Sequence, residues 1–508
     1  MKKNTFFLII FLLTKFILQY SLIGPEYELH RDEYLHLDQG LHLAWGYISV
    51  PPVTSWISYI IHLLGKGVFW IKFFPALFGA LTMLVVWKTI EEINGGLFAL
   101  CLGSLAVLLS GILRINILYQ PNSLDILLWA LSNFAILKNI NSVSQKWLYV
   151  AAFAFALGFL NKYTIVFLFL GLLPAILFTA QRIIFINKHF YLALVLGLLI
   201  ITPNLIWQYH NNFPVVHHLE ELTKTQLVNA NRIDFFKEQI LFFFGSIFVV
   251  VAALTSFLIY LPFKKYRLLF WSFLFTLSLL VFFKAKGYYA IGLYPFLLAF
   301  GSVYLEQLLK IGWTIYLRPV AIALPILLFI PLFRIAFPNK SPDYILQNPQ
   351  RYKDLNLLRW EDGKDHSLPQ DFADMLGWKE LAQKVDSAYE EIADKEHTLV
   401  LCDNYGQAGA INYYSKNKSI QAVSFNADYI NWFPLSRQLL HVVFIKEEGD
   451  TDKNREKEKP LFTTVMQFDQ INNPFARERN TRIYILKNAR IDLNKRIREE
   501  LEKKKNDR

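Results

Sequence analysis

An Asp-Glu pair, Asp32 and Glu33, stands among polar and aromatic residues directly after the first hydrophobic segment of the chain. A carboxylate there could act as a general base, because it takes a proton from a hydroxyl group within hydrogen-bond reach. If residues 31–45 form a helix, Asp32, His36 and Gln39 share one face, and Glu33 lies about 100° round from Asp32. One carboxylate could then face a cavity while its neighbour makes a structural bond. The alternative is that both acids only stabilise the first turn of an interfacial helix.

Cations near the expected outer ends of hydrophobic segments could hold the negative charge of a phosphate leaving group. A phosphate is a stable anion when it departs, so a transfer with a phosphate leaving group needs no general acid to protonate it. Lys162 stands out because it interrupts a long apolar run, and a cation at such a place tends to have a partner. The alternative interpretation is that each lysine side chain only extends its charged end to the membrane interface and binds no ligand. The candidates for phosphate contact are Lys162, Lys284, Lys286 and Arg114.

For the sugar transfer that the resemblance given below implies, three side chains are candidates for contact with the sugar or the acceptor. Tyr288 and Tyr289 follow Lys286, and aromatic rings beside a cation suit a sugar phosphate. His36 would lie on the helix face of Asp32, at one edge of the same site.

Two further groups of polar residues have a structural interpretation. Arg114 and Asp125 stand on either side of a turn, where an ion pair is the favoured interpretation. His30, His36 and His42 recur every six residues, about 240° per step on a helix, so they do not share a face and make a poor metal triad. We expect no required cofactor. A divalent metal is possible but not needed, because the lysines could neutralise a phosphate.

The composition indicates an integral membrane protein. Hydrophobic residues make up 54% of the 508 residues and aromatic residues 16%, against 18% charged residues, which is too apolar for an ordinary soluble protein. The formal net charge of +11 comes largely from Lys and Arg in gaps between apolar runs, so nucleic acid is not an expected partner. Cys101 and Cys402 lie in unlike regions, and no disulfide is expected between them.

The apolar runs predict a polytopic α-helical protein with about 11 to 13 transmembrane helices, since about 20 apolar residues cross a membrane as a helix. Some of the runs are short enough to merge or split. We interpret the first as a signal anchor. The candidates are residues 5–23, 67–90, 96–113, 122–138, 147–160, 163–180, 190–206, 239–262, 268–283, 288–305 and 314–333.

The positive-inside rule predicts the orientation, because Lys and Arg in short loops gather on the cytoplasmic side. If the spans alternate, loop 24–65, loop 207–238 and everything after residue 334 face outward, and any chemistry takes place at that face. We therefore expect a multi-pass membrane protein, and the resemblance given below implies a bacterial cytoplasmic (inner) membrane. The loop cations that would share the cytoplasmic side are Lys138, Lys146, Arg182, Lys188, Lys264, Lys265 and Arg267.

The composition becomes mixed and polar after the last span, which predicts a transmembrane domain over 1–335, a linker over 336–350 and a small extracytoplasmic α/β domain over 351–490. A charged helical tail over 491–508 follows. "WKELAQKVDSAYEEIA" and "QAGAINYYS" predict helices, and "TLVLCD", "HVVFIKE" and "TRIYILK" predict strands. The segment "CDNYGQAGAINYY" could cradle a ligand at a helix N-terminus, but a fold-forming turn is the favoured interpretation.

Five stretches, taken in order, resemble the successive landmarks of the bacterial protein O-mannosyltransferase and aminoarabinose transferase superfamily, the GT-C glycosyltransferases. The similarity covers residues 1 to about 335, and the C-terminal part resembles, more loosely, the periplasmic domain of many such proteins. The stretches are "DEYLHLDQGLHLAWGYISVPPVTSWI", "RINILYQPNSLDILLWAL", "LNKYTIVFLFLGLL", "TPNLIWQYHNNFPVVHHLEELTKTQ" and "KGYYAIGLYPFLLAFG".

The resemblance implies a GT-C fold and transfer of a sugar, with inversion, from a polyprenyl-phosphate donor to a lipid, glycan or protein acceptor outside the membrane. It maps the family's catalytic carboxylate onto Asp32, its companion onto Glu33 and a further acid onto Asp125. The aminoarabinose branch has an arginine and a lysine where this chain has Leu35 and Val50, so that branch's donor and phosphate contacts do not carry over.

Other classes stay open. An O-antigen ligase or polymerase would use different external-loop landmarks, so the Asp-Glu pair argues against it. A transporter or flippase of lipid-linked sugars would ordinarily show two halves with matching interruptions, which this sequence lacks. A noncatalytic scaffold or receptor would explain the soluble domain but not an acid-bearing loop backed by external lysines.

Overall fold

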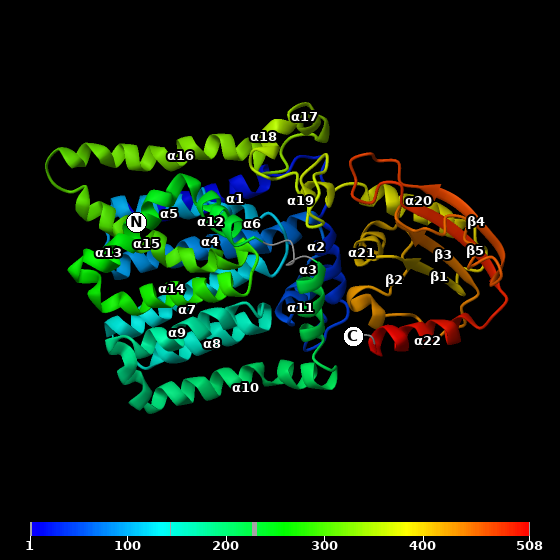
Figure 1. Cartoon of the computed structure of the whole chain (residues 1–508), viewed down its shortest axis with the longest axis horizontal. Helices are drawn as coiled ribbons and strands as arrows, with labels where there is room; N and C mark the ends of the chain where they lie inside the picture. The colour runs from blue at the N-terminus through cyan, green and yellow to red at the C-terminus, as the bar shows by residue number, and fades with distance from the viewer. Residues whose placement is uncertain (1–2, 143, 226–230, 507–508) are drawn as a thin grey trace.

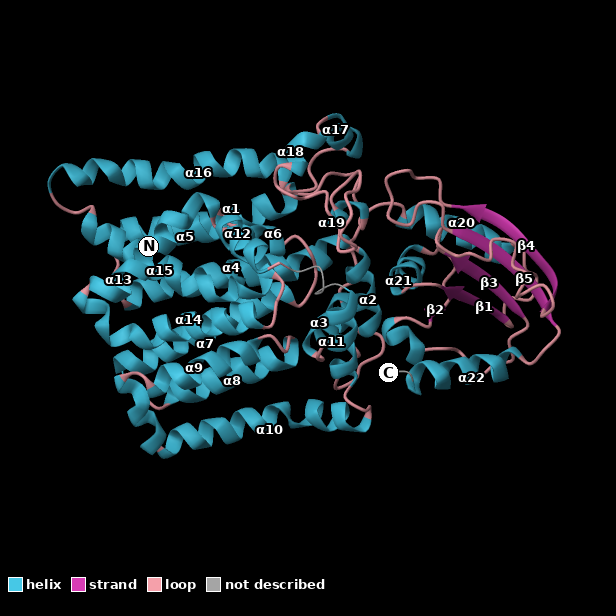
Figure 2. Ribbon diagram, viewed as in Figure 1, coloured by secondary structure: helices cyan, strands magenta, loops and turns pink. Residues whose placement is uncertain are grey.

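The protein consists of a long helical bundle and a smaller domain built on a mixed sheet (Figures 1 and 2). The computed structural model describes residues 3–142, 144–225 and 231–506. In Figure 1 the bundle fills the left two thirds of the view, and the sheet domain lies against its right-hand end. The short helices of the segments between spans gather at the junction of the two parts.

The bundle helices coincide with the apolar runs of the sequence. Within the described residues, seven helices are long and apolar enough to cross a membrane, or up to nine if each of two bent pairs is one span. The expectation of a polytopic α-helical protein is therefore confirmed. The bundle helices are α1 (Lys3–Ser21), α4 (Val68–Glu92), α5 (Leu97–Leu108), α7 (Asn122–Ser142), α8 (Lys146–Asn161), α9 (Ile165–Leu177), α10 (Lys188–His210), α12 (Arg232–Phe242), α13 (Ile247–Ile259), α14 (Arg267–Phe282), α15 (Tyr294–Leu308) and α16 (Leu317–Ile335).

Some spans are bent or extended in ways that the sequence did not predict. The predicted span 239–262 is α12 and α13, joined by the 3₁₀ turn η3 (Phe244–Ser246) with a bend of 68°. The span 163–180 is α9, followed by η1 (Ala180–Ile186) after a bend of 103°. Further 3₁₀ segments precede three helices: η4 (Leu261–Tyr266) before α14, η5 (Gly287–Leu293) before α15 and η6 (Gly312–Tyr316) before α16.

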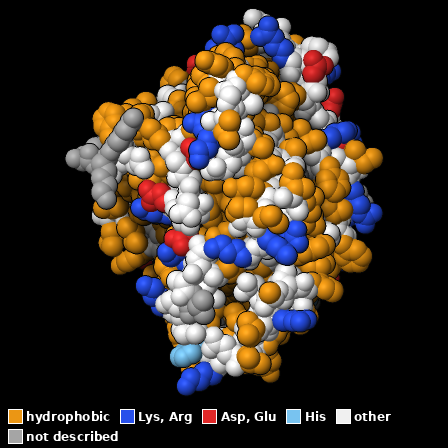
Figure 3. All heavy atoms as spheres, turned by 90° about the vertical axis from the view of Figure 1, so that its left-hand side faces the viewer, with side chains coloured by type: hydrophobic (Ala, Val, Ile, Leu, Met, Phe, Trp, Pro, Cys, Tyr) orange, Lys and Arg blue, Asp and Glu red, His pale blue; other side chains and the backbone are white. Residues whose placement is uncertain are grey.

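The bundle end far from the sheet domain carries loop cations. Figure 3 looks onto this end and shows Lys and Arg side chains spread over a largely hydrophobic surface. Lys138 forms an ion pair with Glu92 at 2.6 Å, and Lys265 donates a hydrogen bond to Asn141. These residues lie at or beside the ends of α4 and α7 and at η4, so they mark the same end of the bundle. The opposite ends of the spans meet the sheet domain.

The loop after α1 forms two short helices, α2 (Arg31–Gln39) and α3 (Val53–Leu63). A capping box begins α2: His30 Nδ1 accepts a bond from the Asp32 amide, and the Glu33 carboxylate accepts one from the His30 amide. The helix ends at Gly40 rather than continuing to residue 45. At Gly40 a Cβ would lie 2.6 Å from Ser58 Cβ, so a glycine lets α2 approach α3.

The C-terminal domain is a five-stranded sheet in the order β2-β1-β3-β5-β4, with helices on its faces. The first three strands are parallel, and β5 runs antiparallel to β3 and β4. The strands are β1 (Thr398–Cys402), β2 (Ala422–Ser424), β3 (His441–Lys446), β4 (Phe462–Gln470) and β5 (Arg482–Ala489). The helical segments are α17 (Pro342–Gln347), α18 (Pro349–Lys353), α19 (Gln370–Ala373), α20 (Trp378–Glu390), α21 (Tyr405–Tyr414), η7 (Ala427–Asn431) and α22 (Leu493–Asn506).

One apolar core runs through the junction of the two parts. Tyr34 of α2 is fully buried, and its ring contacts Trp378 of α20 edge to face and Tyr414 of α21. Helix α21 approaches α2 at Gly409, where a Cβ would lie 2.6 Å from Tyr34 Cβ. The same core includes Val400 of β1. Burial of this apolar surface holds α2 firmly against the sheet domain.

Candidate active site

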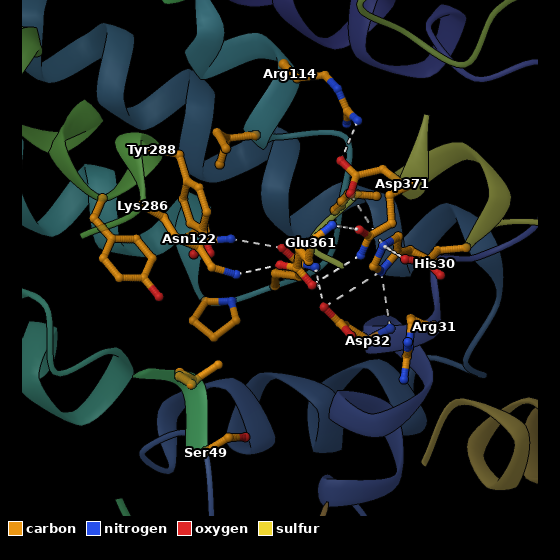
Figure 4. Close-up of a pocket in the computed structure, with 18 of the residues that line it drawn as sticks. His30, Arg31, Asp32, Ser49, Arg114, Asn122, Lys286, Tyr288, Glu361 and Asp371 are labelled. Atoms are coloured by element: carbon orange, nitrogen blue, oxygen red, sulfur yellow. Dashed lines mark hydrogen bonds and ion pairs between the residues drawn. The ribbon is translucent and has the colours of Figure 1, made fainter. Parts of the chain in front are cut away.

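A cavity of about 1240 Å³ lies where the bundle meets the C-terminal domain. Helix α2 borders it, together with the turn between α8 and α9, the turn between α14 and η5, and helix α11 (Pro214–Thr225). Pockets for single small ligands are usually smaller, about 300–1,000 Å³, so two substrates fit here together. Figure 4 shows part of its lining. The predicted site residues that line it are Asp32, His36, Arg114, Lys162, Lys286, Tyr288 and Tyr289.

Asp32 is the second residue of α2, and 34% of its side chain is exposed. Tyr405 Oη donates a hydrogen bond of 2.6 Å to Oδ1, and Gln120 Nε2 donates one of 2.9 Å to Oδ2. Each carboxylate oxygen can accept a second hydrogen bond. The side chain is therefore held in place and still able to receive a proton from a ligand in the cavity.

The surroundings of Asp32 keep its carboxylate ionised. Burial alone would raise the pKa of Asp32, but the charges of His30 and Arg31 and the Tyr405 hydrogen bond outweigh it and lower the pKa below the ordinary value. Burial lowers the pKa of His30, whereas Asp32, Asp374 and Asp371 raise it, and the balance lies at about 9. Asp32 is thus a carboxylate at neutral pH, with positive charge beside it.

Glu33 points the other way and has a different role. Its side chain is fully buried and accepts two bonds from Lys72 Nζ of α4, at 2.6 and 2.7 Å. It also accepts bonds from the backbone amides of Tyr119, at 2.6 Å, and His30, at 2.7 Å. Glu33 therefore ties α2 to α4 and to the segment before α7, and it does not line the cavity.

Lys162 also lines the cavity, at the break between α8 and α9, where the backbone is extended. Its Nζ donates a bond of 2.7 Å to Asn122 Oδ1 and lies 4.2 Å from the Tyr289 ring centroid and 5.0 Å from that of Tyr288. The aromatic rings and the amide hold the cation without neutralising it with a carboxylate. The sequence pattern paired the two tyrosines with Lys286, whereas the cation over their rings is that of Lys162.

Two other cations of the cavity pair with acids of α19 and of the loop before it. Lys286 Nζ lies 2.6 Å from Glu361 Oε1, and Arg114 Nη2 lies 2.7 Å from Asp371 Oδ2 (Figure 4). The predicted ion pair between Arg114 and Asp125 is therefore wrong. The guanidinium pairs instead with Asp371, which lies far along the chain in the C-terminal part.

Besides Glu33, two predicted residues lie outside the cavity. Asp125 is buried at the start of α7, where it accepts bonds from Trp129 Nε1, at 3.0 Å, and Thr164 Oγ1, at 2.9 Å. Lys284 follows α14 and lines a separate small pocket with Arg232. Asp125 supports the turn that carries Lys162, and Lys284 does not line this cavity.

His30, Asp371 and Asp374 bring donor atoms within 4.8 Å of one another and could in principle hold a metal ion. The ring nitrogen Nε2 of His30 is buried without a hydrogen-bond partner among the described residues, 3.5 Å from Asp374 Oδ2. The α2 cap bond to Nδ1 exists only with the neutral ring, whose proton then lies on Nε2. The charged ring, which a pKa of about 9 favours, loses that bond and carries a proton on Nε2 as well. Arg114 and Arg477 already pair with the two carboxylates. The cluster is therefore better suited to a charge network than to a metal ion.

Sequence reasoning missed the residues that the C-terminal part contributes. Tyr405 is separated from Asp32 by 373 positions, and Glu361 from Lys286 by 75. The one available signal was the strand-turn-helix order around "CDNYGQAG", whose helix begins at Tyr405 with Asn404 as its N-cap. Gln120 and Asn122 lie inside a stretch that did attract attention, but their amides have no distinguishing pattern.

Comparisons with known proteins agree with this architecture. The family model described as dolichyl-phosphate-mannose-protein mannosyltransferase matches residues 49–207. Among curated proteins none matches this chain. The fold matches ArnT from Cupriavidus metallidurans bound to undecaprenyl phosphate, with a TM-score of 0.62 and 12% identity, over 95% of this chain and 98% of that one. The apo state of the same protein gives 0.62 and 13%, over 96% and 99%.

The archaeal oligosaccharyltransferase AglB from Archaeoglobus fulgidus, in complex with an inhibitory peptide and a dolichol-phosphate, matches at a TM-score of 0.47 and 10% identity, over 87% of this chain and 70% of that one. The family model and the ArnT-like fold confirm the resemblance to GT-C glycosyltransferases that the sequence indicated. They also confirm the predicted combination of a helical bundle with a small C-terminal sheet domain.

Proposed function

We propose that this chain is a membrane glycosyltransferase that moves a sugar from a polyprenyl-phosphate donor to an acceptor outside the cytoplasmic membrane. The acceptor is a lipid, a glycan or a protein. The observation that carries the proposal is one cavity that holds an oriented carboxylate, Asp32, and a cation on aromatic rings, Lys162. A base and an anion-binding group in one cavity are what such a transfer requires.

The reaction balances without a cofactor. Asp32 takes the proton of the acceptor hydroxyl as its oxygen forms a bond to the anomeric carbon of the sugar. The bond from that carbon to the phosphate oxygen breaks, and its electron pair leaves with the phosphate. Lys162 and Lys286 hold the departing phosphate, and the acceptor enters from the opposite face, so the anomeric configuration inverts. Asp32 then releases its proton to water.

The tyrosines and His36 have a positioning role in this proposal. The Tyr288 and Tyr289 rings fix Lys162 and offer apolar faces against which a sugar ring packs. His36 lies one turn after Asp32 and bonds Gln39 Oε1 through Nδ1 at 2.9 Å. Burial lowers the pKa of His36, so the ring stays neutral and can contact a hydroxyl without competing for the phosphate.

The cavity end of the bundle is assigned to the outer face of the membrane. The loop cations Lys138 and Lys265 mark the other end, which suits the cytoplasm by the positive-inside rule. A prenyl tail would then remain in the outer leaflet while its phosphate reaches Lys162. The C-terminal domain would lie outside the cytoplasm.

Mass spectrometry of envelope lipids and glycans tests this function in cells with the protein, without it, and with Asp32→Asn. We expect one glycosylated species to vanish in the deletion strain and to stay absent with Asp32→Asn, because a carboxylate base contributes about 10²–10⁴-fold to such a step. Asp32→Asn protein should still reach the membrane in normal amounts. Identical envelopes in all three strains, or full activity of the variant, would count against the proposal.

A further inference from the structure

Arg31 precedes the proposed base, Asp32, and its guanidinium has no role in the proposed transfer. Its guanidinium lies 4.4 Å from the Tyr405 ring centroid and lines the cavity. Within residues 3–142, 144–225 and 231–506, no carboxylate comes within ion-pair distance of it, and its Nε is buried without a hydrogen-bond partner. A largely desolvated guanidinium that lacks a bonded anion is costly unless a ligand supplies one.

The other cations of the cavity differ from Arg31 in this respect. Lys286 has Glu361, Arg114 has Asp371, and Lys162 has an amide and two rings. The acids whose charges act on Arg31 are also engaged elsewhere: Asp32 by Tyr405 and Gln120, Asp374 by Arg477, and Glu478 by Gln407. They keep Arg31 charged without bonding it.

The position of Arg31 indicates which substrate it meets. In Figure 4 Asp32 lies between Lys286 with Tyr288 on one side and Arg31 on the other. Transfer with inversion places the leaving phosphate and the attacking hydroxyl on opposite faces of the sugar carbon, and the base stands beside the hydroxyl. If the lysine side holds the donor phosphate, Arg31 lies on the acceptor side.

The C-terminal domain contributes other residues to the lining of the same cavity. Tyr405 lies against Arg31, and Asn426 and Lys504 also line the cavity. Lys504 belongs to the basic end of α22, and its Nζ lies 5.9 Å from the Phe425 ring centroid. The C-terminal domain therefore adds a cation and neutral hydrogen-bonding groups to the cavity.

We propose that Arg31, stacked on Tyr405, forms an anion subsite that binds an acidic group, a phosphate or a carboxylate, on the acceptor. The planar fork of the guanidinium suits either oxyanion through two parallel hydrogen bonds. This inference rests on the proposed function, and it specifies the acceptor as an anionic molecule whose acidic group lies a short distance from the glycosylated hydroxyl. The C-terminal domain thereby takes part in acceptor selection.

The first test uses purified full-length protein and acceptors extracted from cells that lack it, with polyprenyl-phosphate-linked sugars from the same cells as donor. One portion of the extract is treated with alkaline phosphatase, and another is amidated with a carbodiimide to neutralise carboxylates. We expect one of the two treatments to reduce transfer at least tenfold, and the effective treatment identifies the anion. Undiminished transfer after both treatments would overturn the subsite. No transfer to the untreated extract would instead count against the glycosyltransferase function itself.

The second test separates acceptor from donor binding with Arg31→Gln. We expect its acceptor KM to rise at least tenfold while its affinity for undecaprenyl phosphate stays within twofold of the wild type. Arg31→Lys should recover part of the acceptor affinity, since it keeps the charge and loses the fork. Arg479→Gln, at an exposed arginine of the C-terminal domain, is the matched control and should change neither constant. Weakened undecaprenyl phosphate binding by Arg31→Gln with an unchanged acceptor KM would assign Arg31 to the donor and refute the proposal.

Discussion

The two sides of α2 place neighbouring carboxylates in opposite environments. On the bundle side, Glu33 is fully buried and bonded to Lys72 and two backbone amides. On the cavity side, Asp32 is partly exposed and bonded by neutral groups, Tyr405 and Gln120. A buried carboxylate that is bonded to a cation has a structural role. A carboxylate that is oriented by neutral donors can still accept a proton and act as a base. The difference separates two acids that the sequence presents as a pair.

The largest expected effect comes from the bundle side. Glu33→Gln leaves Lys72 as a buried cation without its counter-ion, and breaking such a pair costs about 3–5 kcal/mol. We expect a clearly lower melting temperature in detergent and a reduced yield of membrane-inserted protein, measured by scanning fluorimetry and quantitative blotting. Asp32→Asn, the matched change on the cavity side, should melt close to the wild type. Equal melting temperatures for the two variants would remove the distinction between the two sides.

The second prediction concerns the cavity side and compares two lysines. Lys162→Met removes a cation that we assign to the donor phosphate, and hydrogen bonds to charged groups contribute about 1.5–3 kcal/mol. Affinity for undecaprenyl phosphate should fall about 10- to 100-fold in a direct binding measurement. Lys284→Met, at a lysine that does not line the cavity, should bind within twofold of the wild type. A larger loss with Lys284→Met would contradict the assignment.

A smaller effect is expected from the Tyr405 hydroxyl, and it concerns pH. The hydrogen bond of Tyr405 to Asp32 helps to lower the pKa of that carboxylate, and a base with a depressed pKa works above it and is lost as the pH falls through it. Tyr405→Phe therefore raises the pKa of Asp32 and moves the acid limb of the rate profile to higher pH. The measurement is kcat against pH at saturating substrates. A profile that drops in height without any shift would indicate a purely structural role for Tyr405.

The smallest expected effect is that of a chelator. Because Nε2 of His30 carries a proton and arginines pair with Asp371 and Asp374, we expect transfer to continue unchanged in excess EDTA. The control restores divalent ions after dialysis and should show no gain. Loss of activity that added Zn²⁺, Mn²⁺ or Mg²⁺ recovers would show that a metal ion acts at this site.

Much of the fold follows from local sequence. Long apolar runs predicted α4, α10 and α16, because each is long enough to cross a membrane. Strand β2 was missed because it has three residues, and β4 because polar residues interrupt its sequence and leave much of the strand exposed. The bend between α12 and α13 has no Pro at its turn, so the run reads as one straight span.

The site was only partly predictable, for a topological reason. Asp32, Lys162 and Lys286 stand at span ends on the same side, so alternation of the spans alone brings them toward one surface. Their partners Tyr405 and Glu361 come from the later part of the chain, and the surface that a soluble domain presents to a bundle depends on packing of its whole core. No local pattern encodes that choice.

The bond between Tyr405 and Asp32 has a consequence for biosynthesis. A ribosome makes the acid long before its phenolic neighbour, and the sheet domain must fold against α2 before the two meet. An unfinished or truncated chain would therefore have the hydrophobic helices and Asp32 in place but lack the finished pocket. Catalytic competence should arrive as a final step of assembly, which protects lipid-linked sugars from premature use.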